Sequence, residues 1–212
     1  MQEGLLPLFP LQVVLLPGST LPLHIFEDRY KEMIGEVLRD KLEFGVVLAS
    51  EKGLVNTGCS ATVDRVLREY PDGRLDILTR GRRRFEVLLL NDERAFLRGA
   101  VEFFDDDEAN DEVEPAGQDL LRNVIAGYNE LQSLSSKDLL DPSGASDPRL
   151  SFRLAQEVPD LSFRQTLLAM RSEAERIRRI ADFLPGFLAR HRKAQHTKNV
   201  AGHNGHGHHP PE

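Results

Sequence analysis

The chain is poor in the side chains on which many enzymes depend. Its 212 residues contain no tryptophan, one cysteine (Cys59) and seven histidines, six of which lie in the last 22 residues. A single cysteine excludes an intramolecular disulfide bond and a cysteine-cluster metal site, and it is typical of a reducing compartment. His24 is the one histidine in the body of the chain, so histidine-based catalysis has a single candidate.

Long apolar runs and nucleotide-binding motifs are also missing. The longest apolar stretch, Leu5–Leu16, is interrupted by Pro7, Pro10 and Gln12, whereas a membrane-spanning helix needs about 20 apolar residues. No glycine precedes a lysine, which excludes a phosphate-binding P-loop, and no serine precedes a lysine by three positions. We therefore expect a soluble, cytoplasmic protein with no membrane partner, no cofactor and no catalytic residue that a motif identifies.

The negative charge is concentrated in one segment. The formal net charge is −7, from 27 basic and 34 acidic residues, and Asp105–Glu114 carries seven acids and no base. The rest of the chain is therefore neutral, which disfavours nucleic acid as a partner because phosphate binding needs clustered lysine and arginine. The acidic segment lacks the spacing of a calcium-binding loop, and we interpret residues 105–116 as a solvated hinge.

The first 104 residues have the pattern of a β-rich unit. Short runs with a period of two alternate with turn signals such as Tyr70–Gly73. The runs that we expect to be strands include Leu11–Leu16, Phe44–Ala49, Ala61–Glu69, Leu75–Thr79, Phe85–Leu90 and Phe96–Phe104. One amphipathic helix over Asp28–Arg39 interrupts them. The pattern predicts a barrel or sandwich with one capping helix over residues 1–104.

Beyond the acidic segment the apolar period changes to 3.6, which predicts a helical bundle over residues 117–190. Asp147-Pro148 is typical of a helix start, and Ser162-x-x-Gln165 and Ser172-x-x-Glu175 have the form of capping boxes. Pro185-Gly186 is expected to end or kink the last helix. Residues 191–212 are rich in His, Gly and Asn and are expected to form a disordered tail.

Several local features each have two interpretations. His24 is a general base, or it hydrogen-bonds a local carbonyl and sets the turn into the helix. Arg80–Arg84 binds phosphates, or it forms a solvated hairpin in which Gly81 bends the chain. Cys59 is interpreted as a small apolar side chain. Four histidines of the tail could chelate a transition metal, namely His203, His206, His208 and His209; no metal site is expected in the body.

Several motifs resemble the N-terminal domain of Lon proteases. They are Leu6-Pro7-Leu8-Phe9-Pro10, Leu21-Pro22-Leu23-His24-Ile25-Phe26-Glu27-Asp28-Arg29-Tyr30, Thr79–Val87, and Arg164-Gln165-Thr166-Leu167-Leu168. They occur in the order of that family and cover about residues 5–188. Asp28 departs from the pattern, because the family usually has proline there. The resemblance implies an α+β fold in which a PUA-like pseudo-barrel precedes a helical bundle.

The resemblance also implies a function. The family domain takes part in recognising protein substrates ahead of an ATPase and a Ser–Lys peptidase, so the chain is expected to be a free-standing, non-catalytic module that binds unfolded or partner polypeptides. We expect the peptide to contact the entrance to the capping helix, at Leu21, Leu23, Phe26, Arg29 and Tyr30, although ordinary packing also explains these residues. A PUA-like nucleic-acid-binding protein and a small hydrolase are the alternatives. The sequence does not define the oligomeric state.

Overall fold

The computed structural model describes residues 4–107, 117–134, 147 and 149–203, and it does not describe the side chains of residues 194–203. The chain divides into two compact units. The first comprises Met1–Glu112 and Pro148–Glu173, and the second comprises Val113–Asp147 and Ala174–Glu212. This division differs from the boundaries expected from the sequence, because the segment from 148 to 173 joins the β-rich unit instead of the remaining helices.

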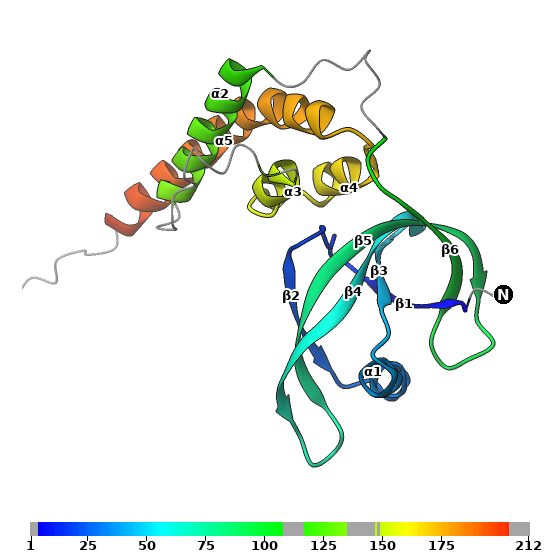
Figure 1. Ribbon diagram of the computed structural model, residues 1–212. Coiled ribbons are helices and arrows are strands. Elements are labelled where there is room, and N and C mark those ends of the chain that lie inside the picture. Colours follow the sequence, from blue (N-terminus) through cyan, green and yellow to red (C-terminus); the bar gives the residue numbers. More distant parts are fainter. Residues whose placement is uncertain (1–3, 108–116, 135–146, 148, 204–212) are drawn as a thin grey trace, which may run out of the picture. The chain divides into compact units, whose positions relative to one another are not determined.

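The strands of the first unit close into a barrel. They are β1 (Leu6–Leu11), β2 (Thr20–Ile25), β3 (Phe44–Ser50), β4 (Gly53–Glu69), β5 (Leu75–Asn91) and β6 (Arg98–Phe104). Their order is β2-β5-β4-β3-β1-β6, and a further pairing between β5 and β6 closes the ring. The β1–β3 pair is parallel and the other pairs are antiparallel. The expected β-rich pseudo-barrel is thus confirmed (Figure 1).

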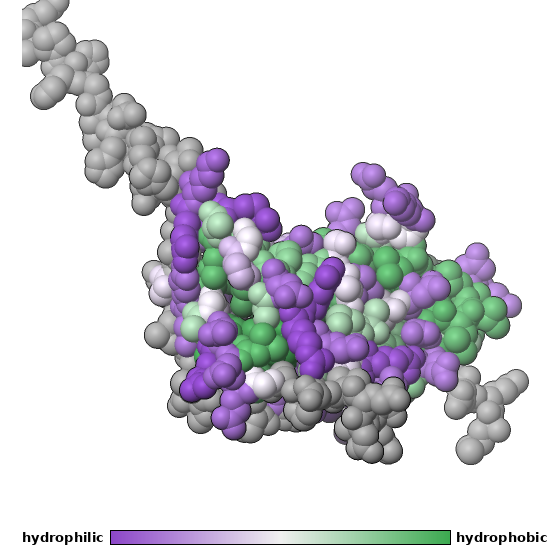
Figure 2. Space-filling view, turned by 90° about the horizontal axis from the view of Figure 1, so that it is seen from above, coloured by the Kyte–Doolittle hydropathy of each residue, from purple (hydrophilic) through white to green (hydrophobic). Residues whose placement is uncertain are grey.

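The barrel interior is tightly packed around Phe85. This side chain is fully buried and clusters with Leu8 and Val47. Gly58 on β4 lies directly against the ring, since a Cβ atom there would be 2.5 Å from Phe85 Cζ, and larger residues would displace it. Some large apolar side chains remain exposed, and Figure 2 shows a hydrophobic patch at its right-hand edge, the side on which β6 lies in Figure 1.

Helix α1 (Asp28–Asp40) confirms the predicted capping helix. Its apolar face is buried, with Tyr30, Met33, Ile34 and Val37 pointing into the core. The helix ends at Lys41, whose left-handed backbone (φ 54°) stops the helical repeat. Figure 1 shows α1 at the end of the barrel opposite α3 and α4.

Strand β5 is longer than the sequence pattern indicates. The expected hairpin at Arg80–Arg84 is wrong, because β5 continues through these residues as one strand, with an irregular register opposite Cys59–Ala61. Gly81 is needed for close approach and not for a bend: a Cβ atom there would lie 2.3 Å from the Leu16 carbonyl oxygen. The Gly81 N–H donates to the Ser19 carbonyl at 2.9 Å, so the segment before β2 lies against this glycine. Residues 12–16, expected to be part of a strand, lie outside β1.

Two short helices complete the first unit, α3 (Leu150–Ala155) and α4 (Leu161–Ala169). Helix α4 begins two residues earlier than the capping box at Ser162 predicts, because the Asp160 side chain accepts a hydrogen bond from the Phe163 N–H at 2.9 Å. Helix α3 begins at Leu150, not directly after Asp147, and Pro148 lies outside the described residues. The Arg164 side chain donates to the carbonyls that follow α3, including Val158 at 2.6 Å, and its burial lowers its pKa.

The C-terminal end of α4 is held on the barrel by Arg84 of β5. This guanidinium donates to the carbonyls of Leu168 and Met170 and to Asp106 Oδ1 at 2.6 Å. Its side chain is only 5% exposed, and it lies between the rings of Phe104 and Phe152. A helix C-terminus leaves unpaired carbonyls, and a cation there satisfies them. Arg84 therefore adds, from a strand, donors for the carbonyls at the C-terminus of α4.

The second unit contains α2 (Gln118–Leu134) and α5 (Glu173–His203). The two helices pack closely where Gly127 faces Leu184 and Leu188, and Arg192 forms an ion pair with Glu130. Because this packing continues beyond Pro185, the proline lies inside α5 and does not end it. The helix also passes residue 190, where the sequence placed the end of the bundle, so residues 191–203 of the expected disordered tail are helical; residues 204–212 lie outside the described residues.

We predict that Arg84→Met lowers the free energy of unfolding by about 3 kcal/mol, since it leaves Asp106 and two carbonyls without their donor in a largely buried site. The matched control is Arg83→Met, which removes a cation whose side chain is 54% exposed and which pairs with Glu43; it is expected to cost under about 1 kcal/mol. Urea denaturation of the two variants measures the difference. Equal losses would show that Arg84 has no special role.

Candidate functional site: a cleft between the barrel and helix α4

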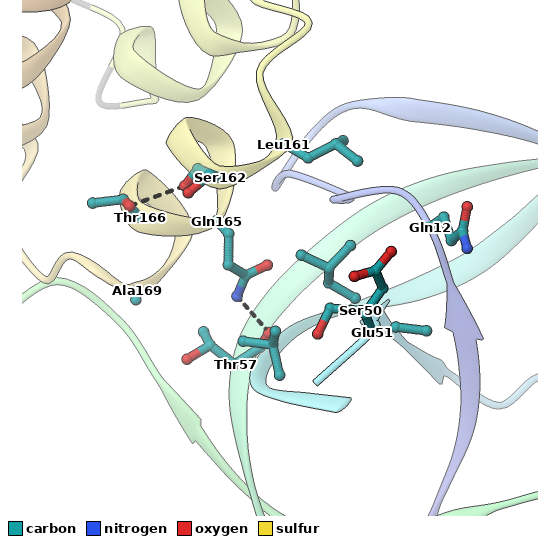
Figure 3. Close-up of a pocket in the computed structure, with 12 residues that line it drawn as sticks. Gln12, Ser50, Glu51, Thr57, Leu161, Ser162, Gln165, Thr166 and Ala169 are labelled. Carbon is teal, nitrogen blue, oxygen red and sulfur yellow. Dashed lines mark hydrogen bonds between the residues drawn. The ribbon is translucent and has the colours of Figure 1, made fainter. Parts of the chain in front are cut away.

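A cleft of about 680 Å³ opens between the β3–β4 end of the barrel and α4 (Figure 3). Both walls belong to the first unit. The strands and the segment after β1 contribute Gln12, Leu48, Ala49, Ser50, Glu51, Val55 and Thr57; the helix contributes Leu161, Ser162, Gln165, Thr166 and Ala169. Its size and mixed lining are those of a ligand-binding cleft.

The strand wall is opened by an irregularity in the β3–β4 ladder. Val47 pairs with Gly58 and Ala49 pairs with Leu54, so three residues of β4 lie opposite Leu48. Leu48 instead has its register partner on β1. The irregular segment leaves Val55, Asn56 and Thr57 of β4 without register partners on β3, and such departures are frequent next to binding sites.

The helix wall is made by small side chains. Ser162, Thr166 and Ala169 follow one another at helical spacing on the exposed face of α4. The Thr166 hydroxyl donates to the Ser162 carbonyl at 2.9 Å, so its hydrogen is already engaged within the helix. Because none of the three side chains is large, the space between helix and strands stays open.

Gln165 joins the two walls. Its Nε2 donates to the Thr57 carbonyl at 2.9 Å (Figure 3). Thr57 also marks the last register pair of β4 with β5, at Glu86. The Gln165 amide thus bonds the Thr57 carbonyl of β4 at the point where the pairing of β4 with β5 ends. The contact fixes the width of the cleft and presents the amide oxygen of Gln165 as a further acceptor.

The lining can bind a ligand but offers little for covalent chemistry. Glu51 is the one charged residue among the lining side chains, and the polar remainder are amides and hydroxyls. Hydroxyls and amides can donate and accept hydrogen bonds, and Leu48 and Val55 supply apolar contact. The lining contains no histidine, cysteine or lysine. The arrangement suits reversible recognition of a ligand with amide groups and small apolar groups.

The five residues predicted to contact a peptide lie on β2, on α1 and, for Phe26, in the connection between them, and none of them lines this cleft. Phe26 is 58% exposed, Arg29 is exposed, and Leu21 and Leu23 are half-buried. Tyr30 is buried, with its ring centroid 4.1 Å from that of Phe9, and burial raises its pKa. Tyr30 is therefore a core residue, which α1 turns toward β1.

His24 belongs to an exposed network and not to a local turn. Its Nδ1 lies 2.6 Å from Asp76 Oδ1, and the Tyr70 hydroxyl donates to Asp76 Oδ2 at 2.8 Å. The predicted partner, a local carbonyl, is thus wrong, because the partner is a carboxylate 52 residues away. The hydrogen bonds from His24 and Tyr70 lower the pKa of Asp76, and the same carboxylate raises the pKa of Tyr70. None of these residues lines the cleft.

The arginine run gives no support to phosphate binding. Arg80 pairs with Asp64 at 2.8 Å, Arg83 with Glu43 at 3.2 Å, and Arg84 with Asp106. Each of these cations already has a carboxylate beside it, so the run does not present a concentrated positive charge.

Among the described residues, no group of three or more His, Cys, Asp or Glu side chains could hold a metal ion. The predicted chelating histidines are outside this test: the side chain of His203 is not described, and His206, His208 and His209 lie beyond the described residues. Among the described helices, none has the length and apolar character that crossing a membrane requires.

Sequence reasoning missed the cleft because its two walls are far apart in the chain. Gln165 and Thr57 are 108 residues apart. The one signal in the sequence is the stripe of Ser162, Thr166 and Ala169, which leaves one face of a short helix without a large side chain. The first unit is thus a closed β-barrel with a cleft between its β3–β4 end and the attached helix α4.

The chain matches the substrate-binding domain of ATP-dependent protease La (Lon) over residues 5–185. It therefore belongs to the LON substrate-binding domain family, which confirms the resemblance seen in the sequence.

Relatives and solved structures agree with this assignment. The chain is 29% identical over 133 residues to Lon protease 1 of Hydrogenovibrio crunogenus, covering 59% of this chain and 16% of that protein. It is 34% identical over 110 residues to the Lon protease of Parabacteroides distasonis, covering 48% and 13%. The chain thus spans about a sixth or less of the length of these proteases.

Two solved structures share the fold. A Lon N-terminal domain protein from Xanthomonas campestris superposes with a TM-score of 0.65 at 27% identity, covering 86% of this chain and 99% of that one. The N-terminal domain of a Mycobacterium avium complex Lon protease superposes with a TM-score of 0.67 at 18% identity, covering 86% and 98%. The second likeness concerns the fold alone.

We predict that Tyr30→Ala lowers the free energy of unfolding by about 3 kcal/mol, because it removes a buried aromatic ring that packs on Phe9. Phe26→Ala, two residues before α1, is expected to change it by less than about 0.5 kcal/mol because that ring is exposed. Thermal or urea unfolding distinguishes the two. Equal and small effects would place Tyr30 on the surface after all.

Cys59 is predicted to be inert in the folded protein. Burial raises the pKa of its thiol to about 12, so only about one molecule in ten thousand carries the thiolate at pH 8. A thiol reagent should label Cys59 in concentrated urea and leave it unlabelled in buffer at that pH. Rapid labelling of the folded chain would contradict its burial.

Proposed function

We propose that this chain is a non-catalytic module that binds extended polypeptide segments, with the cleft between β3, β4 and α4 as the binding site. The observation that carries the proposal is the cleft lining, which combines main-chain-like amides, hydroxyls and small apolar surfaces next to an irregular strand edge. Polypeptide backbone offers the matching donors and acceptors in every residue. Membership in a substrate-binding domain family supports a protein substrate as the ligand.

The mode of binding follows from the strand wall. Around Val55, β4 lacks a register partner on β3, and a peptide lying alongside it could form main-chain hydrogen bonds of the β-augmentation type. Such bonds do not depend on the peptide sequence, which is the property a binder of varied polypeptides needs. Side chains of the peptide would then meet Leu161 and the small residues of α4.

The surface at β2 and the start of α1 is proposed as a second, weaker contact. Phe26 offers an exposed ring, and Arg29 lies beside it in the chain, while Leu21 and Leu23 are half-buried next to them. Tyr30 supports this surface from below through its packing on Phe9. Its role there would be to hold the surface in place and not to touch the peptide.

The test fills the cleft without disturbing the core. Ser162→Trp places a large ring on the exposed cleft face of α4, and Ser133→Trp makes the same change at an exposed position of α2. Binding of a fluorescently labelled, permanently unfolded protein is measured by anisotropy. We expect Ser162→Trp to weaken binding roughly tenfold, because the ring occupies space that the ligand needs.

Ser133→Trp should bind like the unsubstituted chain, and both variants should keep its urea midpoint. Wild-type affinity in a well-folded Ser162→Trp variant would remove the cleft from consideration. If Phe26→Ala together with Arg29→Ala then weakened binding, the surface at β2 and α1 would take its place.

A further inference from the structure

The second half of β5 carries an exposed and partly unpaired strand. The last register pair between β4 and β5 is Thr57 with Glu86, while β5 continues along β6 as far as Asn91. Among the described strands, none pairs with the other edge of β5 beyond Glu86. The residues there are Leu88, Leu89 and Leu90, which are 58%, 71% and 54% exposed.

The cover that α3 and α4 give to the β5–β6 pair ends just before these leucines. Arg84 and Phe104 are 5% and 7% exposed beneath the end of α4. Two residues further along the same face of β5, the Glu86 side chain is already 44% exposed, and Arg171, which follows α4, lies 3.5 Å from its carboxylate. The exposure of side chains on this face of β5 therefore rises from Arg84 toward Leu88.

Two carboxylates lie side by side at this transition. Glu86 on β5 is the direct register partner of Glu102 on β6, and Glu102 is exposed. Like charges directly opposite one another destabilise a sheet pair. Arg171 is the one cation within ion-pair distance of Glu86 in the described structure, so the surface beside the leucines has excess negative charge.

An open strand edge with three exposed leucines invites pairing, and natural proteins usually protect such edges with charge, proline or cover. Here the apolar strand edge lies next to the two carboxylates. One ligand could therefore bury the exposed leucines and neutralise the carboxylates. That ligand has an apolar extended segment to pair with β5 and a cation to approach Glu86 and Glu102.

We propose that the β5–β6 arm, defined as Glu86–Leu90 with Glu102, binds an extended polypeptide segment in which apolar residues adjoin lysine or arginine. The inference rests on the proposed function in taking a polypeptide as the ligand, but it assigns a further surface, separate from the cleft and from the surface at β2 and α1. It also adds a preference for basic peptides, which the cleft does not supply because Glu51 is its one charged lining residue.

Charge argues against two other occupants. The acidic run Asp105–Glu114 would be repelled by Glu86 and Glu102. In a second copy paired antiparallel about Leu89, Glu86 would face Asp92 of that copy, again with like charges opposed. A basic and apolar segment of another protein has neither conflict.

The probes are two fluorescent ten-residue peptides, one with three leucines followed by two lysines and one with two glutamates in place of the lysines. Anisotropy with the full chain should give roughly fivefold tighter binding of the lysine peptide, from two partly exposed charge contacts.

The joint variant Leu88→Thr, Leu89→Thr, Leu90→Thr should lose binding roughly tenfold, since threonine keeps the strand but removes apolar surface. The control, Val66→Thr with Leu67→Thr, alters exposed apolar residues of β4 and should bind normally.

Glu102→Lys tests the charge separately from the fold. It should reverse the peptide preference while leaving the melting temperature unchanged or higher, because it replaces a like-charge pair by an opposite one. Equal affinity for the two peptides, or wild-type binding by the threonine variant, would overturn the assignment of the arm.

The outcomes also separate this inference from the proposed function. If the unfolded protein binds, and Ser162→Trp weakens it, while the arm variants bind both peptides normally, the arm alone is wrong. If neither the peptides nor the unfolded protein binds the unsubstituted chain, both proposals fail. A dimer in sedimentation velocity that disappears in the threonine variant would make a second copy the occupant and overturn this inference.

Discussion

The guanidinium of Arg84 is the contact on which the functional part of the molecule depends. It projects from β5 and satisfies the C-terminal carbonyls of α4, while Asp106 balances its charge. A short helix has little stability of its own, because helix formation has a costly nucleus and its ends leave polar groups unpaired. Capping from the barrel therefore does two things at once: it stabilises α4, and it fixes where the helix lies relative to β4.

The cleft is a consequence of that placement. With its C-terminal end held by Arg84 and its middle tied to β4 by Gln165, α4 cannot close onto the strands or move away from them. The irregular β3–β4 ladder then leaves open backbone on one wall, and small side chains leave space on the other. Polypeptide recognition is proposed to use this space because backbone amides are what its lining matches best.

Patterns that depend on local geometry were readable in the sequence. The helical period of α1 and the turn at Tyr70–Gly73 are present as predicted, the turn closed by a hydrogen bond from the Gly73 N–H to the Tyr70 carbonyl. Features set by distant partners were not readable. The sequence pattern predicts a bend at Gly81, whereas the structure shows that the Leu16 carbonyl lies too close for any side chain there. Arg84 looks solvated among other arginines, because its partners come from α4 and from the end of β6.

The candidate site shows the same limit. Tyr30 sits in the most specific motif of the sequence, yet its ring packs on Phe9, so motif specificity here reflects the fold. The residues that form the cleft have ordinary side chains, and only the three-dimensional meeting of β4 and α4 gives them a role.

Hydrogen exchange followed by mass spectrometry, with and without a saturating unfolded protein, tests the central claim most directly. Bound polypeptide should slow exchange in residues 53–57 of β4 and in residues 161–169 of α4, since the peptide would pair with one wall and shield the other. Unchanged exchange in both segments, with protection elsewhere in the chain, would contradict the assignment of this cleft as the polypeptide-binding site.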